Sequence, residues 1–99
     1  MLIRTVRMTF RPDRLETFHA LFRDTASRIR AAPGCRRLEL WEDARFPNVL
    51  TTYSYWTDGE ALEAYRESEL FRSTWAKTKP LFAAPPVARS QYPIARIEG

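Results

Sequence analysis

The chain has 99 residues, of which 44% are hydrophobic, 28% charged and 13% aromatic, and its formal net charge is +4. A chain of this length forms one domain, and none of its apolar runs approaches the roughly 20 residues of a membrane-spanning helix. We therefore expect no membrane partner. Because the arginines are spread over the whole chain instead of forming one basic patch, we also expect no nucleic acid as a partner.

The first predicted element is a strand over residues 2–10, which is rich in β-branched and apolar residues. Pro12 and the capping-box spacing of Asp13 and Glu16 then predict the start of a helix. Apolar residues at intervals of three and four extend this helix as far as Pro33-Gly34, which ends it. Its apolar face consists of Leu15, Phe18, Phe22, Ala26 and Ile29.

Two further strands are predicted over residues 35–42 and 49–56, and the short turn between them makes an antiparallel hairpin. Asp58 predicts the N-cap of a second helix, and Ser68 caps its continuation after a bend. A last strand is expected over residues 87–92. The predicted domain therefore covers residues 1–92, and residues 93–99 form a C-terminal tail.

This order, β-α-β-β-α-β, predicts an α+β protein of ferredoxin-like topology, with a four-stranded antiparallel sheet and its helices on one face. The strands carry apolar side chains on both faces, so a large apolar surface would be left without a helix to cover it. Because such a surface is seldom left in water, we predict a homodimer in which two sheets pack face to face.

Two stretches resemble the antibiotic biosynthesis monooxygenase domain, and the resemblance covers nearly the whole chain. One is Ala32-Pro33-Gly34-Cys35, and the other runs from Tyr55-Trp56 through Asp58, Ala61-Leu62, Tyr65, Ser68 and Phe71. Residues 69–79 are similar to those of a subgroup of small stand-alone members. The resemblance implies that two sheets form a dimeric α+β barrel. It also implies a monooxygenase that needs no cofactor, since well-studied relatives oxygenate polyketide anthrones or quinols without metal or flavin.

The family's functional positions are only partly kept. The polyketide-oxygenating relatives place an Asn and, four residues later, a Trp along the third strand, where this chain has Thr52 and Trp56. The haem-degrading relatives use an Asn, a Trp and an axial His, where this chain has Val6, Tyr65 and Trp75. The resemblance therefore implies that this chain binds no haem or metal in the family manner.

Trp56, Tyr65 and Trp75 are accordingly predicted to converge on one apolar pocket for a small aromatic ligand, with Thr52 and Arg7 as polar contacts. The same aromatic residues could instead fill the space themselves as a closed core. Two functions stay open at this point. One is a cofactor-independent monooxygenase acting on a small aromatic or quinol-type substrate. The other is a non-catalytic dimeric module that binds a small aromatic ligand or serves in assembly.

Two further residues have chemistry that enzymes use. His19 is the only histidine, but its place at the edge of the first helix's apolar face favours a flanking role over that of a general base. Cys35 is the only cysteine, has no visible base partner, and is expected to be buried. One His and one Cys cannot supply the three protein ligands of a metal site, so none is predicted. The lone cysteine and the charged N-terminus, which differs from a signal peptide, favour a cytoplasmic protein.

Overall fold

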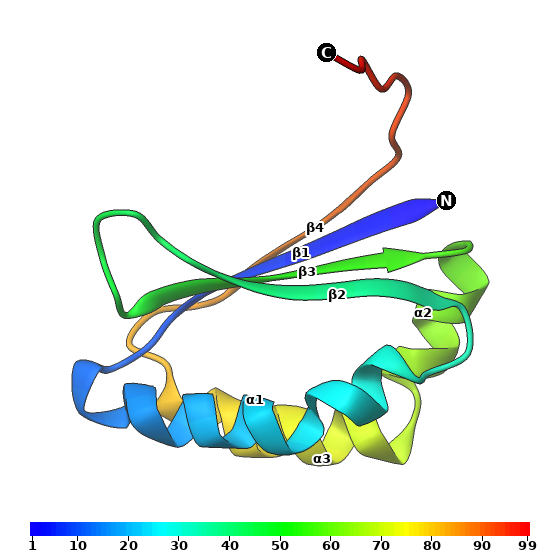
Figure 1. Ribbon diagram of the computed structural model, residues 1–99. Coiled ribbons are helices and arrows are strands. Elements are labelled where there is room, and N and C mark those ends of the chain that lie inside the picture. The colour runs from blue at the N-terminus through cyan, green and yellow to red at the C-terminus, as the bar shows by residue number, and fades with distance from the viewer.

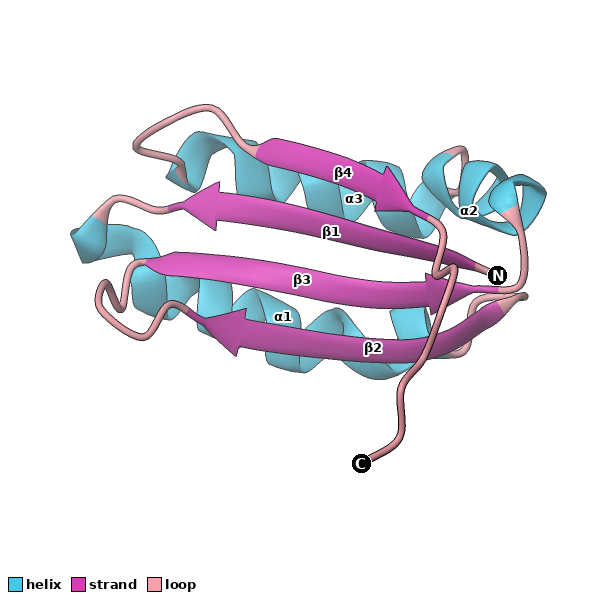
Figure 2. Cartoon of the chain, turned by 90° about the horizontal axis from the view of Figure 1, so that it is seen from above, coloured by secondary structure: helices cyan, strands magenta, loops and turns pink.

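The computed structural model describes residues 1–99 and has two layers, a sheet and a layer of helices (Figure 1). The sheet is antiparallel with strand order β2-β3-β1-β4, formed by β1 (Leu2–Thr9), β2 (Cys35–Glu42), β3 (Val49–Trp56) and β4 (Val87–Gln91). Figure 2 shows that the helices lie on one side of it: α1 (Leu15–Arg30), α2 (Gly59–Arg66) and α3 (Glu69–Thr78). This is the predicted ferredoxin-like α+β fold. No helix has both the length and the apolar character needed to cross a membrane.

The predicted helices and strands agree with the structure except at the start of the first helix. The second helix is divided into α2 and α3, and both predicted caps are present. The side chain of Asp58 accepts a hydrogen bond from the amide of Ala61 (2.8 Å), and that of Ser68 from the amide of Phe71 (3.2 Å). The capping box predicted at Asp13 was wrong, because residues Pro12–Arg14 form a 3-10 turn ahead of α1 that makes no side-chain cap.

The core consists of two clusters at opposite ends of the strands. One gathers Met8, Phe10, Phe18, Leu50 and Leu81, and the other Leu2, Cys35, Trp56 and Leu62. The pairing of β1 with β3 explains this division, since Met8 lies opposite Leu50 and Leu2 lies opposite Trp56. Between these pairs, on the same face of the sheet, lie smaller or polar residues that do not fill the space under the helices.

Gly34, in the turn between α1 and β2, has a left-handed backbone (φ 84°). A β-carbon added there would lie 2.5 Å from the Cβ of Ala61 and 2.9 Å from the Thr57 hydroxyl. We therefore expect Gly34→Ala to lower the free energy of unfolding by about 1–3 kcal/mol from backbone strain, with a further loss from the contact with α2. Urea denaturation measures this loss. Gly59→Ala is the control, because nothing lies within 4 Å of a β-carbon at that position. Equal stabilities of the two variants would contradict the prediction.

The face of the sheet opposite the helices is uncovered in the single chain. Tyr53, Tyr55 and Ile3 lie on it, and Trp41 stacks on Tyr53 with ring centroids 4.9 Å apart. Residues 92–99 leave the end of β4 on this side of the sheet without regular secondary structure (Figures 1 and 2).

Candidate functional site

A cavity of about 290 Å³ lies between the sheet and the helices. Its sheet wall comes from the middle of β1 and β3, where the residues that face the helices are Arg4, Val6, Thr52 and Ser54. Because none of these is a large apolar residue, the two core clusters close the ends of the space but leave its middle open. Of the 21 residues that line the cavity, 13 are hydrophobic. Its volume is near the lower end of the roughly 300–1,000 Å³ typical of ligand pockets, which suits a small ligand.

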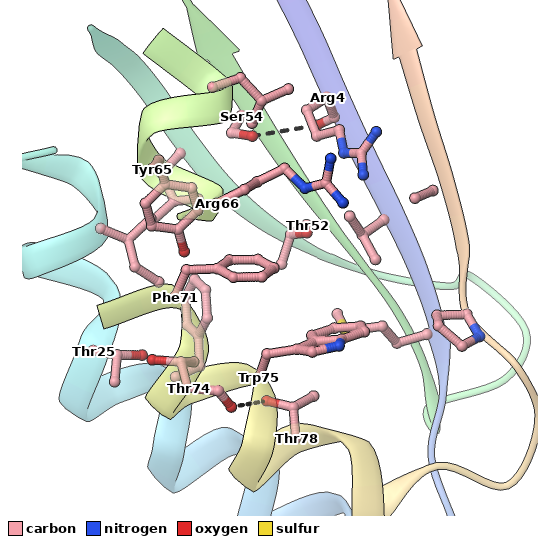
Figure 3. Close-up of a pocket in the computed structure, with 18 of the residues that line it drawn as sticks. Arg4, Thr25, Thr52, Ser54, Tyr65, Arg66, Phe71, Thr74, Trp75 and Thr78 are labelled. Atoms are coloured by element: carbon pink, nitrogen blue, oxygen red, sulfur yellow. Dashed lines mark hydrogen bonds between the residues drawn. The ribbon is translucent and has the colours of Figure 1, made fainter. Parts of the chain in front are cut away.

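Aromatic rings form the helix wall of the cavity (Figure 3). Tyr65 of α2 meets Phe71 of α3 edge to face, with centroids 5.4 Å apart. Phe71 in turn stacks on Trp75, with centroids 6.0 Å apart and the ring planes inclined by 14°. Trp75 also meets the ring of Phe82 edge to face, with centroids 5.6 Å apart. Since aromatic faces favour flat partners, this wall suits a planar ligand.

Trp56 lies behind this wall and belongs to the core. Its side chain is completely buried, and its ring stacks on Tyr65 with centroids 5.1 Å apart. The indole N–H donates to the hydroxyl of Ser54 (2.9 Å), which donates to the carbonyl of Arg4 (3.4 Å). Trp56 therefore borders the predicted cavity, but its only polar group is already occupied, and its main effect there is to position Tyr65.

The phenol of Tyr65 is a hydrogen-bond donor at neutral pH. Burial, reinforced by the nearby Cys35, raises its pKa to about 12. A phenol with this pKa is almost wholly protonated near pH 7, so it cannot serve as a general base. It can donate a hydrogen bond to an oxygen atom of a ligand in the cavity.

The remaining polar groups of the cavity differ in their availability. The hydroxyls of Thr25 and Thr78 donate to helix carbonyls four residues earlier, at 2.9 and 2.8 Å. Arg4 and Arg66 reach the opposite end of the cavity from β1 and α2, and Thr52 lies beside them (Figure 3). Polar contacts to a ligand would therefore come from this end and from the hydroxyls of Tyr65 and Thr74, which also line the cavity.

The prediction for Arg7 was wrong. Side chains alternate along β1, so Arg7 shares the uncovered face with Ile3 and Thr5, while Arg4 shares the helix-facing side with Val6 and Met8. The pKa of the Asp43 carboxyl group is lowered mainly by the hydrogen bonds that it accepts from backbone amides. The positive charge of the exposed Arg7 nearby lowers it further. Arg4, for which no role was predicted, takes the place expected for Arg7.

Neither His19 nor Cys35 lines the cavity. Cys35 is buried, as predicted, and its thiol donates to the carbonyl of Arg37 (3.6 Å). Burial raises the pKa of this thiol, which keeps it protonated and unreactive at neutral pH. The structure contains no group of three or more His, Cys, Asp or Glu residues that could hold a metal ion.

The antibiotic biosynthesis monooxygenase family model matches residues 1–77, more than three quarters of the chain. The chain belongs to this family. The match ends within α3, so it includes β1, β3, α2 and Trp75, the elements that carry the predicted site. No curated protein matches the sequence.

Solved structures show how closely this family member keeps the fold. The crystal structure of an antibiotic biosynthesis monooxygenase is similar with a TM-score of 0.90 and 18% sequence identity, over 96% of this chain and all of the other. A Mycobacterium tuberculosis protein gives a TM-score of 0.89 at 24% identity, over 98% of each chain. A Pseudomonas aeruginosa protein gives 0.84 at 22%, over 95% of this chain and 94% of the other. At these identities the likeness establishes the fold.

Four of the five residues predicted for the site line this one cavity: Thr52, Trp56, Tyr65 and Trp75. The sequence prediction missed Arg4, Arg66 and Phe71. The alternation of side chains along β1 could have identified Arg4. Residues an even number apart on a strand share a face, so Arg4 shares the helix-facing side with the core residue Met8. No comparable signal pointed to Arg66, which lies in the last turn of α2 and looks like an ordinary charged helix end.

Proposed function

We propose that this antibiotic biosynthesis monooxygenase family protein binds a small aromatic or quinol-type molecule in the cavity and oxygenates it without a bound cofactor. The observation that carries the proposal is the cavity itself. It lies between the two core clusters, is walled by Tyr65, Phe71 and Trp75, and is supplied with only a few polar groups. This combination of apolar walls and sparse polar contacts is typical of small-molecule sites.

The quinol and dioxygen balance the reaction between them, without a further reductant. In oxygenation of a quinol, the ring gains one oxygen atom and loses two hydrogen atoms, and the second atom of dioxygen leaves as water. The quinol supplies all the electrons, so the protein must bind it, orient it and keep bulk water away. Tyr65 would hold a ligand oxygen by donating its proton in a hydrogen bond, since its raised pKa keeps the phenol protonated.

A specific observation favours a second function, that of a non-catalytic module which binds a small aromatic ligand. The residues that line the cavity include no His, Asp, Glu or Cys. Deprotonation of a quinol would therefore depend on the ligand's own acidity and on solvent, because the most common general bases of enzymes are missing from the site.

Oxygen uptake separates the two functions. With a panel of quinols and a metal chelator present, the oxygenase predicts saturable oxygen consumption proportional to protein and above that of the quinol alone. The binding module predicts that a quinol quenches tryptophan fluorescence while oxygen consumption stays at the background rate. Absence of both effects across the panel would contradict both functions.

We further propose that the uncovered face of the sheet pairs with that of a second copy. Trp41, Val87 and Tyr92 are 44%, 36% and 70% exposed in the single chain, and Ile94 and Ile97 in the tail are 97% and 89% exposed. Apolar surface of this extent usually marks an interface, and an obligate dimer commonly buries more than about 2,000 Å². The tail, which lies on this side of the sheet, would extend the contact with the partner.

The dimer can be tested by light scattering at micromolar concentration. We expect a mass twice the 11.6 kDa of the chain. Tyr53→Arg should reduce the mass to that of the monomer, because it places a charge in the middle of the uncovered face, opposite Thr5 and Glu39. Ala20→Arg is the control, since Ala20 lies on the exposed side of α1. A monomeric wild-type protein would contradict the proposal.

A further inference from the structure

One end of the cavity carries more positive charge than the neighbouring carboxylates neutralise. Arg4 extends from β1 and Arg66 from the last turn of α2, and both line the cavity. In Figure 3 their guanidinium groups reach the same end from opposite walls, above Thr52. The positive charge of Arg66 acts on Arg4, whose pKa is lowered first by burial and then by this neighbour, with Glu63 opposing the shift.

The partners of the two arginines show the imbalance. Arg66 pairs with Glu63 at 3.0 Å across the surface of α2. Arg4 donates to the hydroxyl of Ser90 on β4 at 3.0 Å, and no carboxylate lies within 4.0 Å of its guanidinium. Two positive charges therefore share one carboxylate at the edge of an otherwise apolar cavity. Repulsion between the two guanidinium groups raises the free energy of the site without a ligand, and an anion bound between them would relieve that repulsion.

We propose that Arg4 and Arg66 form an anion-binding end of the cavity, and that the ligand is a small aromatic acid whose carboxylate lies between the two guanidinium groups. Its ring would then lie along the wall formed by Tyr65, Phe71 and Trp75. The proposal rests on the proposed use of this cavity as a ligand site, and it specifies the substrate class.

The geometry favours a carboxylate for two reasons. A guanidinium group presents its N–H donors in a planar fork that matches the two oxygens of a carboxylate. The cavity between this end and Trp75 is lined by apolar and aromatic side chains, which attract a ring but offer no counter-charge. A ligand with one acidic group and one flat ring therefore satisfies both parts of the site at once.

Calorimetric binding of two closely matched probes tests this proposal. The probes are 2,5-dihydroxybenzoate and its neutral amide, 2,5-dihydroxybenzamide. We expect the acid to bind wild-type protein at least tenfold more tightly than the amide. Arg4→Gln should weaken binding of the acid about tenfold to hundredfold, as expected for loss of a charged hydrogen-bond partner, and leave the amide unchanged. Arg7→Gln is the control, because it removes the same charge from the same strand on the opposite face.

Arg66→Gln provides a second variant if Arg4→Gln does not fold, and Arg72→Gln, at an exposed position of α3, is its control. Equal affinities for the acid and the amide, or no binding of the acid at millimolar concentration, would overturn the proposal. So would equal effects of Arg4→Gln and Arg7→Gln, or of Arg66→Gln and Arg72→Gln. Preferential binding of the acid without oxygen uptake would contradict only the oxygenase function. Oxygen uptake with neutral quinols but no preference for acids would contradict only the anion-binding end.

Discussion

Replacing Trp56 with alanine is expected to lower the free energy of unfolding by about 3–5 kcal/mol, because a completely buried indole leaves a void in the core. The void would open among Leu2, Cys35 and Leu62, and the change would also remove the stacking with Tyr65 and the hydrogen bond to Ser54. Urea denaturation followed by circular dichroism measures the loss.

Trp56→Phe separates packing from hydrogen bonding in this comparison. Phenylalanine keeps most of the buried ring and loses the N–H donor, so this variant should lose much less stability than Trp56→Ala. If Trp56→Ala costs less than about 1.5 kcal/mol, the side chain is not held in a packed core, and its assignment is wrong.

Replacing Trp75 with alanine is expected to cost little stability and to weaken ligand binding. Trp75 is only partly buried and already borders open space, so the variant should lose about 1–2 kcal/mol of stability from its contacts with Phe71 and Phe82. Binding of a planar ligand should weaken several-fold to tenfold, because one wall of the site is lost. Calorimetry or fluorescence with the same probe measures this effect.

Trp41→Ala is the control for binding, since Trp41 lies on the uncovered face of the sheet, away from the cavity. It should leave ligand affinity unchanged. A loss of about 3–5 kcal/mol in Trp75→Ala, equal to that in Trp56→Ala, would mean that both residues pack in one closed core. That result would contradict the ligand site and with it the main support for catalysis.

Much of the fold could be predicted because its signals are local. Alternation along residues 35–42 and 49–56 gave two strands with the bounds that the structure shows, and Asp58 and Ser68 marked the starts of α2 and α3. The start of α1 was less predictable. Asp13 and Glu16 have capping-box spacing, but Pro12 instead begins a 3-10 turn, a conformation close in energy that depends on how the chain leaves β1.

The residues of the candidate site could be predicted where a position known from the family also lies on the helix-facing side of its strand. Thr52 and Trp56 are four residues apart on β3 and face the helices together. The choice between Arg4 and Arg7 needed only the parity of β1, because residues an odd number apart on a strand lie on opposite faces. The proximity of Arg4 to Arg66 could not be predicted from the sequence, because it depends on how α2 lies over the end of the sheet. That packing is tertiary and leaves no periodic signal in the sequence.

Product analysis under isotopically labelled dioxygen tests the proposed oxygenation most directly. The purified protein, with a chelator present, would be incubated with a quinol that it binds, and the product would be examined by mass spectrometry. We predict one labelled oxygen atom in each product molecule, formed in proportion to protein and at a reduced rate in Trp75→Ala. A product without label, or the same labelled yield in the absence of protein, would contradict the account.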